Sequence, residues 1–155
     1  MPPERTPAEG PGEQGLEKLS LLVLSGTFER VHYALVLASA AAAIGKPATL
    51  FFTDRALRAL LSADAQGAPG WRSLTAVEGA SGGAVDDDYR ARGVAGFEEL
   101  LSGCVDLGVR FIACEMGLRA MRLHPSALRS DVPVEVAGVV TFLGDASAGG
   151  AMLML

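Results

Sequence analysis

The sequence predicts an α/β fold, a three-layer α/β/α sandwich built on a mainly parallel, five-stranded sheet. Three observations support this prediction. Five short apolar runs are spaced along the chain, and segments typical of helices or turns separate them. Several runs are apolar at consecutive positions, as in strands that are buried on both faces of a parallel sheet. The length of 155 residues fits one domain.

The first 15 residues differ in composition from the rest of the chain. MPPERTPAEGPGEQG contains four of the eight prolines and three glutamates. Such a segment has nothing apolar to bury, so we expect a disordered tail over residues 1–15 and a single domain over residues 16–155. It also lacks the apolar region of a signal peptide. The uncharged stretch over residues 31–45 is shorter than the roughly 20 residues that span a bilayer. We therefore expect a cytoplasmic protein without a membrane span.

Charge and cysteine content exclude further classes of protein. The chain has 13 Lys and Arg against 18 Asp and Glu, and its pI is about 5.0. Nucleic-acid-binding domains usually carry a basic surface, so we expect no nucleic-acid partner. Two cysteines are too few for a disulfide-rich scaffold. Two cysteines and two histidines without a Cys-x-x-Cys pair also argue against structural zinc, and we expect no metal site.

The first three elements are expected within residues 19–53. Residues 19–24 (LSLLVL) predict a buried strand that ends at Ser25-Gly26-Thr27. Residues 28–44 are rich in Ala and Leu and predict a helix, with Thr27 as its N-cap. Residues 48–53 predict the second strand. Because the helix is apolar on most sides, we expect it to be deeply buried or to lie at a subunit interface.

The middle of the chain shows little periodicity. A short helix is expected from Asp54 to about residue 61. Residues 62–92 are rich in Gly, Ala, Ser and Asp, and we expect a long loop or flexible flap there. Its glycine-rich run at 79–83 does not follow a strand, so it predicts no dinucleotide site. The consecutive acids Asp86-Asp87-Asp88 resemble a metal cluster, but on a loop they are more typical of a solvated charge run.

In the C-terminal half, segments typical of helices again alternate with apolar runs typical of strands. Residues 93–107 predict a helix with one apolar face, formed by Phe97, Leu100, Leu101, Cys104 and Leu107. The remaining expected elements are a strand at 109–114, a short helix at 116–123, a turn at 126–130, a strand at 134–142 that can bend at Gly138, and a strand at 151–155.

Candidate site residues are those that follow the strands, because parallel sheets bind ligands beyond the carboxyl ends of their strands. They are Ser25-Gly26-Thr27, Thr53-Asp54 and Cys114-Glu115. Cys114 ends a strand and precedes a helix, where free N–H groups and the helix dipole favour a thiolate. Glu115 opposes this effect, and Arg119 one turn later can offset it. The alternative is that Cys114 is a small, buried core residue.

Four other features have a structural and a functional interpretation. Cys104 lies on an apolar helix face, which favours core packing over the role of a resolving cysteine. The Ser25-Gly26-Thr27 turn is either an anion site at a helix N-terminus or an ordinary N-cap. We expect His32 to be a hydrogen-bonded histidine near the domain surface and His124 to shape the turn before Pro125.

Three segments resemble the DsrE/DsrF-like family, in particular the branch often labelled peroxiredoxin-like. They are LSLLVLSGTFERVHYALVLASAAAAIGKPATLFFT (19–53), FIACEMGLRAM (111–121) and VEVAGVVTFLGDA (134–146). The Cys114-Glu115-Met116 pattern and the Ser-Gly-Thr turn are the most specific parts. The resemblance implies a three-layer fold of the DsrE type, homo-oligomers, and no heme, flavin or nicotinamide cofactor.

The resemblance also implies a role for Cys114, because it matches the cysteine that carries a persulfide in sulfur-relay members. We therefore expect a sulfur carrier or sulfurtransferase-like protein, rather than an enzyme with turnover, that exchanges sulfur with donor and acceptor proteins. The residues expected to line its site are Ser25, Gly26, Thr27, Thr53 and Met116. No resolving or acid–base group is identifiable near Cys114, so peroxidase activity is not expected. Two alternatives are a non-catalytic, oligomeric module that binds a small ligand, and a purely structural subunit.

Overall fold

The computed structural model describes residues 15–155, so the tail expected over residues 1–15 lies outside the described residues except for Gly15. The described chain forms one five-stranded sheet in the order β4-β3-β2-β1-β5, and every neighbouring pair is parallel. This confirms the expected fold class. The strands are β1 (Leu19–Val23), β2 (Ala48–Phe52), β3 (Arg110–Cys114), β4 (Val134–Ala137) and β5 (Ala151–Met154).

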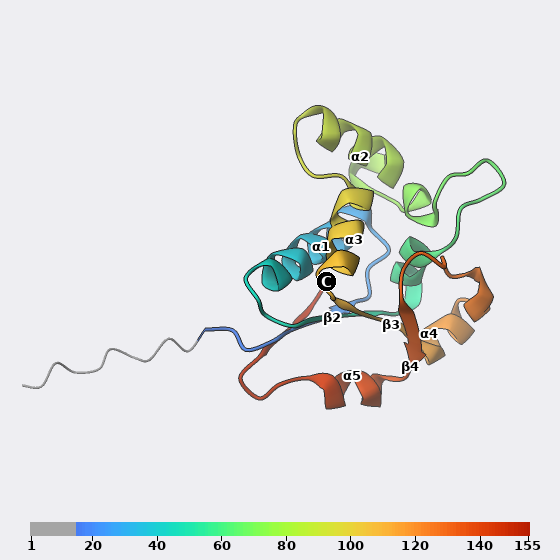
Figure 1. Ribbon diagram of the computed structural model, residues 1–155. Coiled ribbons are helices and arrows are strands. Elements are labelled where there is room, and N and C mark those ends of the chain that lie inside the picture. Colours follow the sequence, from blue (N-terminus) through green and yellow to red (C-terminus); the bar gives the residue numbers. More distant parts are fainter. Residues whose placement is uncertain (1–14) are drawn as a thin grey trace, which may run out of the picture.

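The strand order decides which helices cover which face. From β1 to β4 the chain moves steadily toward one edge, and it then returns to place β5 on the other side of β1. Right-handed crossovers put all connections that run in one direction on the same face. Figure 1 shows α1 (Phe28–Ala43), α2 (Gly82–Ala91) and α3 (Phe97–Asp106) on one side of the sheet and α5 (Val139–Asp145) on the other. Among the residues described, no helix is both long and apolar enough to cross a membrane.

The first face carries most of the hydrophobic core. Alternate strand residues, such as Leu21, Leu50 and Phe111, contribute to one cluster with α1 and α3. The buried side of α1 follows the helical repeat and consists of Phe28, Val31, His32, Ala34, Leu35, Ala38 and Ala41. Its alanines are small, which lets α3 pack closely against it. The helix expected over residues 28–44 is therefore present, but only one of its sides is buried, since Tyr33 on the other side is 56% exposed.

The second face has a much smaller cluster, formed by Phe51, Ile112, Cys114 and Phe142. The rings of Phe51 and Phe142 stack with centroids 4.8 Å apart. At the far end of α5, Asp145 forms ion pairs with Lys18 (2.6 Å) and Arg110 (2.8 Å) and accepts a hydrogen bond from Thr49. Aromatic stacking and a shared carboxylate thus hold α5 against the sheet.

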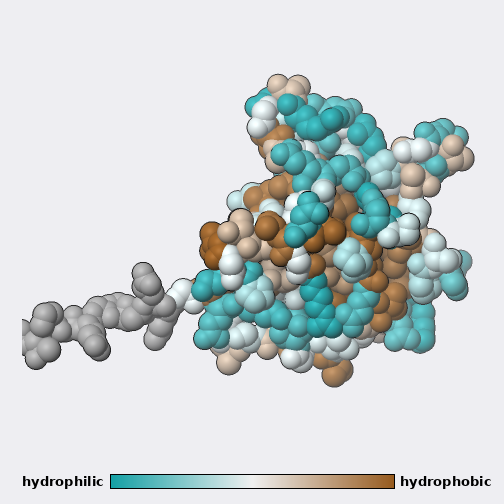
Figure 2. Space-filling view, in the orientation of Figure 1, coloured by the Kyte–Doolittle hydropathy of each residue, from teal (hydrophilic) through white to brown (hydrophobic). Residues whose placement is uncertain are grey.

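Two expectations about secondary structure are wrong. The long loop expected over residues 62–92 contains two short 3₁₀ segments and then the helix α2. Ser81 caps α2 by accepting the Ala84 N–H, and Asp86 accepts the Phe97 N–H at 2.6 Å. The helix is therefore held by polar contacts, and Figure 2 shows that its outer surface is mainly hydrophilic. The apolar residues of α2 do not recur clearly at helical spacing, so the sequence pattern did not indicate a helix there.

The second error concerns residues 134–142, for which one strand was expected. The strand β4 stops at Ala137, and α5 begins at Val139 after Gly138. Val139, Val140 and Thr141 favour strands when judged by type alone. The contacts of Phe142 and Asp145 with the sheet require a helical turn, and these distant contacts override the local preference.

We expect Asp145→Asn to lower the free energy of unfolding by about 1–3 kcal/mol at neutral pH, because Lys18 and Arg110 would lose their shared carboxylate. Burial alone would raise the pKa of Asp145, but hydrogen bonds from Lys18, Thr49 and Arg110 outweigh it and hold the pKa below its usual value of 3.8. A lowered pKa in the folded state gives stability that is complete above the unfolded pKa and is lost as pH falls through the folded pKa.

Urea denaturation of both proteins across pH checks this prediction. The difference between wild type and Asp145→Asn should shrink below about pH 4. Asp106→Asn is the matched control, because Asp106 is exposed and has no ion pair within residues 15–155. A difference that is unchanged at low pH would contradict the role given to the Asp145 charge.

Candidate functional site

An apolar cavity of about 380 Å³ lies at the carboxyl ends of β1, β2 and β3, and we call it the thiol cavity. Its walls come from the ends of these strands, from α4 (Glu115–Ala120) and from the first residue of α5. The lining residues are Leu22, Leu24, Phe51, Thr53, Asp54, Cys114, Met116, Gly117, Ala120 and Val139. Four of the residues expected from the sequence, Cys114, Thr53, Asp54 and Met116, therefore share one cavity.

Cys114 is the last residue of β3 and the N-cap of α4. Its side chain is on the second face of the sheet, and the residue is 3% exposed. The sulfur accepts a hydrogen bond from the Gly117 N–H at 3.3 Å. An N–H group in this position stabilises negative charge on sulfur. The site therefore combines an apolar enclosure with one polar contact aimed at the thiol.

Gly117 was not singled out in the sequence, although a glycine inside a short helix was the available signal. A Cβ atom built there would lie 2.6 Å from Thr53 Oγ1 and 2.9 Å from the Asp54 backbone nitrogen. Any side chain would therefore push α4 away from the end of β2. The missing side chain lets the Gly117 N–H stay at the Cys114 sulfur.

The residues next to Cys114 face outward. Met116 is 73% exposed at the rim of the thiol cavity. Arg119 donates to Glu115 at 2.8 Å, as the spacing of four residues suggested. This ion pair partly neutralises the carboxylate beside the thiol. Because both partners are exposed, solvent screens the effect.

The Ser25-Gly26-Thr27 turn does not line the thiol cavity. Gly26 instead borders a separate polar hollow, and the Ser25 and Thr27 hydroxyl oxygens lie 2.9 Å from each other. Thr27 occupies the N-cap position of α1, but its side chain makes no capping hydrogen bond. The carbonyl of Thr75 accepts the Phe28 N–H at 2.8 Å, so residues around 75 cover this end of the helix.

Cys104 is a core residue. It lies on the buried face of α3, and its thiol donates to the Leu35 carbonyl at 3.5 Å. Burial raises the pKa of the Cys104 thiol to about 12. Cys104 belongs to the first-face cluster and Cys114 to the second, so the sheet separates the two free cysteines. The expected core role is confirmed, and a role as resolving partner within the same chain is not supported.

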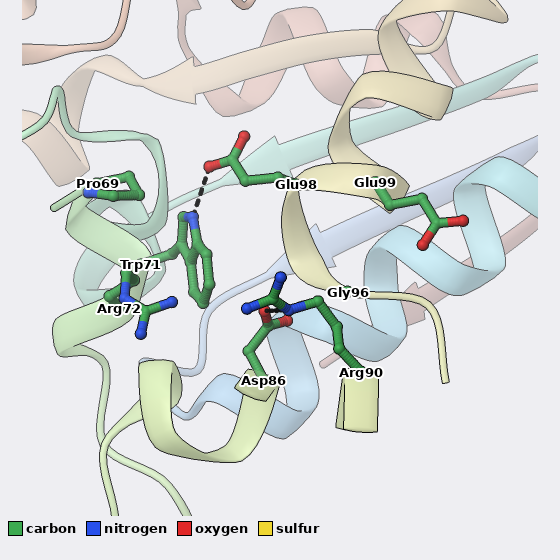
Figure 3. A pocket seen from close by; sticks show the side chains of 8 residues that line it. All are labelled: Pro69, Trp71, Arg72, Asp86, Arg90, Gly96, Glu98 and Glu99. Atoms are coloured by element: carbon green, nitrogen blue, oxygen red, sulfur yellow. Dashed lines mark hydrogen bonds and ion pairs between the residues drawn. The ribbon is translucent and has the colours of Figure 1, made fainter. Parts of the chain in front are cut away.

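A larger polar hollow of about 450 Å³ lies between α2, α3 and the segment around Trp71 (Figure 3). Trp71 donates its indole N–H to Glu98 at 2.7 Å, and Arg90 pairs with Asp86 at 3.3 Å. The guanidinium of Arg72 lies over the Trp71 ring, 5.3 Å from its centroid. These polar groups already have partners, and their contacts join the segments that border the hollow.

Of the three consecutive acids, Asp87 and Asp88 are exposed as expected for a solvated charge run, and only Asp86 departs from that expectation. Asp86 is buried and holds the N-terminus of α3, whereas Asp87 pairs with Arg72 and Asp88 with Arg92. The correction follows from the helix that replaces the expected loop. In the part of the chain that the structure describes, no three His, Cys, Asp or Glu side chains come together as a metal site.

The two histidines have structural contacts. His32 donates from Nε2 to the Ala95 carbonyl at 2.8 Å and packs against the rings of Phe28 and Tyr89. His124 accepts the Ser126 N–H on Nδ1, which fixes the turn at Pro125–Ala127. Both histidines therefore have the structural roles that the sequence predicted.

Comparison with known proteins identifies the family. A family model described as the DsrE/DsrF/DrsH-like family matches residues 72–154, and the chain belongs to this family. The chain is 29% identical over 145 residues to the sulfur carrier protein DsrE2 of Allochromatium vinosum, and the match covers 81% of this chain and 90% of the relative. The resemblance inferred from the sequence segments is thus confirmed.

A solved structure shows the same fold. The protein of unknown function MTH1491 from Methanobacterium thermoautotrophicum superposes with a TM-score of 0.51 at 17% sequence identity. The match covers 89% of this chain and 98% of that chain. At this identity the likeness supports the fold alone.

We expect Gly117→Ala to lower the free energy of unfolding by about 1–3 kcal/mol, because the added methyl group overlaps Thr53 and the Asp54 backbone. Gly103→Ala on α3 is the matched control, since nothing lies within 4 Å of its added Cβ. That substitution should leave stability unchanged or raise it by up to about 1 kcal/mol. Urea denaturation measures both, and equal effects of the two substitutions would contradict the close approach at Gly117.

We expect Cys104 to resist alkylation in the native protein. With a pKa of about 12, only about one Cys104 thiol in 10⁴ is ionised at pH 8, and the thiol is also buried. Iodoacetamide labelling of Cys114→Ser, which retains only Cys104, should proceed only after denaturation. Rapid labelling of this variant under native conditions would show that α3 does not protect the thiol.

Proposed function

We propose that this protein is a sulfur carrier that holds sulfur as a persulfide on Cys114. One observation carries the proposal: the thiol lies in an apolar cavity at the carboxyl ends of the strands, with the Gly117 N–H directed at its sulfur. The curated relative named as a sulfur carrier supports the same assignment. The protein would act as a carrier with donor and acceptor proteins rather than as an enzyme with turnover.

The transfer needs no external oxidant. The Cys114 thiolate attacks the outer sulfur of a donor persulfide, the donor S–S bond breaks, and the donor leaves as a thiolate. A new S–S bond on Cys114 then carries the sulfur. In the second half an acceptor thiolate attacks this outer sulfur, and Cys114 leaves as a thiolate. Each half exchanges one S–S bond for another, so electrons balance.

The cavity suits this chemistry in two respects. Its apolar walls offer water and small polar reagents few hydrogen-bonding groups beside a labile persulfide. The Gly117 N–H can stabilise the thiolate that forms whenever sulfur is released. Since Cys114 is 3% exposed, the rim residues Met116 and Val139 must shift when a partner cysteine enters. Of the sequence candidates, Thr53 and Met116 would contact the incoming group.

The assignment of site residues extends only partly to the turn before α1. Ser25, Gly26 and Thr27 do not line the thiol cavity. They would contribute only indirectly, by fixing the position of the carboxyl end of β1. A cytoplasmic location fits the proposal, because thiols stay reduced there.

The burial of Cys114 favours a second candidate function. In a non-catalytic module the domain would bind a small ligand, and Cys114 would only pack against its neighbours in the core. A thiol with 3% exposure is also compatible with that role. The two functions differ in one property, because only the carrier requires Cys114 to accept sulfur.

Intact mass spectrometry distinguishes the two functions. Wild type, Cys104→Ser and Cys114→Ser are exposed to polysulfide, or to a desulfurase with cysteine. Their intact masses are then measured, and the modified residue is located by peptide mapping. We expect wild type and Cys104→Ser to gain one sulfur atom that a thiol reductant removes, and Cys114→Ser to gain none. Sulfur on Cys114→Ser at the wild-type level would overturn the proposal, and absence of any addition would favour the binding module.

We also propose that copies of this chain associate through the second face of the sheet. Only the seven-residue helix α5 covers this face in the described chain, and Val140 (80%) and Met154 (70%) are highly exposed there. Exposed apolar patches are typical of the surfaces through which protein chains associate.

Light scattering at micromolar protein concentration should show an oligomer, and Val140→Glu should weaken it. A monomeric wild-type protein would exclude the association.

A further inference from the structure

A polar hollow of about 210 Å³ shares no lining residue with the thiol cavity. It is bordered by the turn before α1, by the 3₁₀ segment η1 (Asp54–Leu60) and by the segment that follows Trp71. The lining residues are Gly26, Arg55, Arg58, Ser73, Leu74 and Thr75. Two arginines and two hydroxyl groups therefore border the hollow, and none of its lining residues is acidic.

The two arginines are held on one side of η1. Residues three apart are nearly eclipsed in a 3₁₀ helix, so Arg55 and Arg58 project in similar directions. The intervening Ala56 and Leu57 are buried in the first core, which keeps both arginines at the surface. Gly26 completes the arrangement, because a Cβ there would lie 2.6 Å from the Arg55 Cβ.

Neither arginine forms an ion pair or a side-chain hydrogen bond within residues 15–155. The contrast with other arginines of the chain is clear. Those with a carboxylate partner are Arg72, Arg90, Arg92, Arg110, Arg119 and Arg129. The net charge of the whole chain is −5. Two guanidinium groups that have no partner in the described part of the chain therefore form a local positive site beside one hollow of an acidic protein.

The hydroxyl groups add further hydrogen-bonding capacity. Thr75 Oγ1 makes a long contact of 3.4 Å with the Gly26 carbonyl, so its proton can turn to a better acceptor. Ser73 donates to the Gly70 carbonyl at 2.8 Å and keeps that bond. The groups free to donate are therefore the two guanidinium forks and the Thr75 hydroxyl.

We propose that this hollow binds a tetrahedral oxyanion, held by Arg55 and Arg58. A guanidinium presents parallel N–H groups that match two oxygens of a phosphate or sulfur oxyanion. Carboxylates are planar and offer only two oxygens, so they would use the two forks less fully. The same chemistry is present in inorganic phosphate, in thiosulfate and in the phosphate of a mononucleotide. The site shares no lining residue with the thiol cavity and is independent of the persulfide proposal.

Isothermal titration with phosphate, thiosulfate and adenosine monophosphate tests the site at constant ionic strength, with chloride as the balancing salt. We expect saturable binding with a Kd of about 1 mM or tighter for at least one oxyanion. Arg55→Gln and Arg58→Gln should each weaken it by about tenfold or more. The relative affinities identify whether a sulfur oxyanion, free phosphate or a nucleotide fits best.

Two controls keep the test specific. Arg122→Gln removes an exposed arginine that has no ion pair among the residues described and does not line the hollow, and it should bind as wild type does. Cys114→Ser should also bind normally, which separates this site from the carrier function. Absence of saturable binding by wild type up to about 10 mM, or equal weakening by Arg55→Gln and Arg122→Gln, would overturn the proposal.

Discussion

The right-handedness of connections between parallel strands is the constraint on which the rest of this structure depends. Four strands follow one another in a single direction, so their connections accumulate on one face of the sheet. Only the return from β4 to β5 crosses the other face, and it carries a helix of seven residues. The large core, the small core and the exposed apolar residues are all consequences of this unequal cover.

The same constraint explains the surroundings of Cys114. Side chains alternate along β3, so Ala113 enters the large core and Cys114 enters the small one. The thiol is therefore enclosed by α5 and α4 rather than by the long helices of the first face. Enclosure by short elements means that few contacts must be broken to uncover the sulfur. This is a property that a buried but reactive group requires.

Much of the fold could be predicted because its strands are runs of consecutive apolar residues, and such runs indicate strands that are buried in a sheet. The positions of Cys114 and Thr53 followed from the rule that parallel sheets place their sites beyond the strand ends, whereas Met116 came from the family resemblance of Cys114-Glu115-Met116. The helix α2 was missed because Asp86 fixes it through the Phe97 N–H, a contact that no local pattern contains. The helix α5 was missed because Val139 and Val140 favour strands, whereas Phe142 and Asp145 decide the outcome. The Ser25-Gly26-Thr27 turn was assigned to the wrong hollow, since residues 73–75 fold over it.

If Cys114 carries a persulfide as proposed, the sheet between the two thiols has a chemical consequence. A nearby thiolate that attacks the inner sulfur of a persulfide forms a disulfide and expels hydrogen sulfide, so the cargo is wasted. Cys104 is on the opposite side of the backbone layer and its pKa is about 12, so it cannot begin this reaction. A sulfur atom held on Cys114 would then leave only when a nucleophile from another molecule attacks it. The five-stranded sheet would thus prevent the protein from losing its sulfur through an internal disulfide between its own two cysteines.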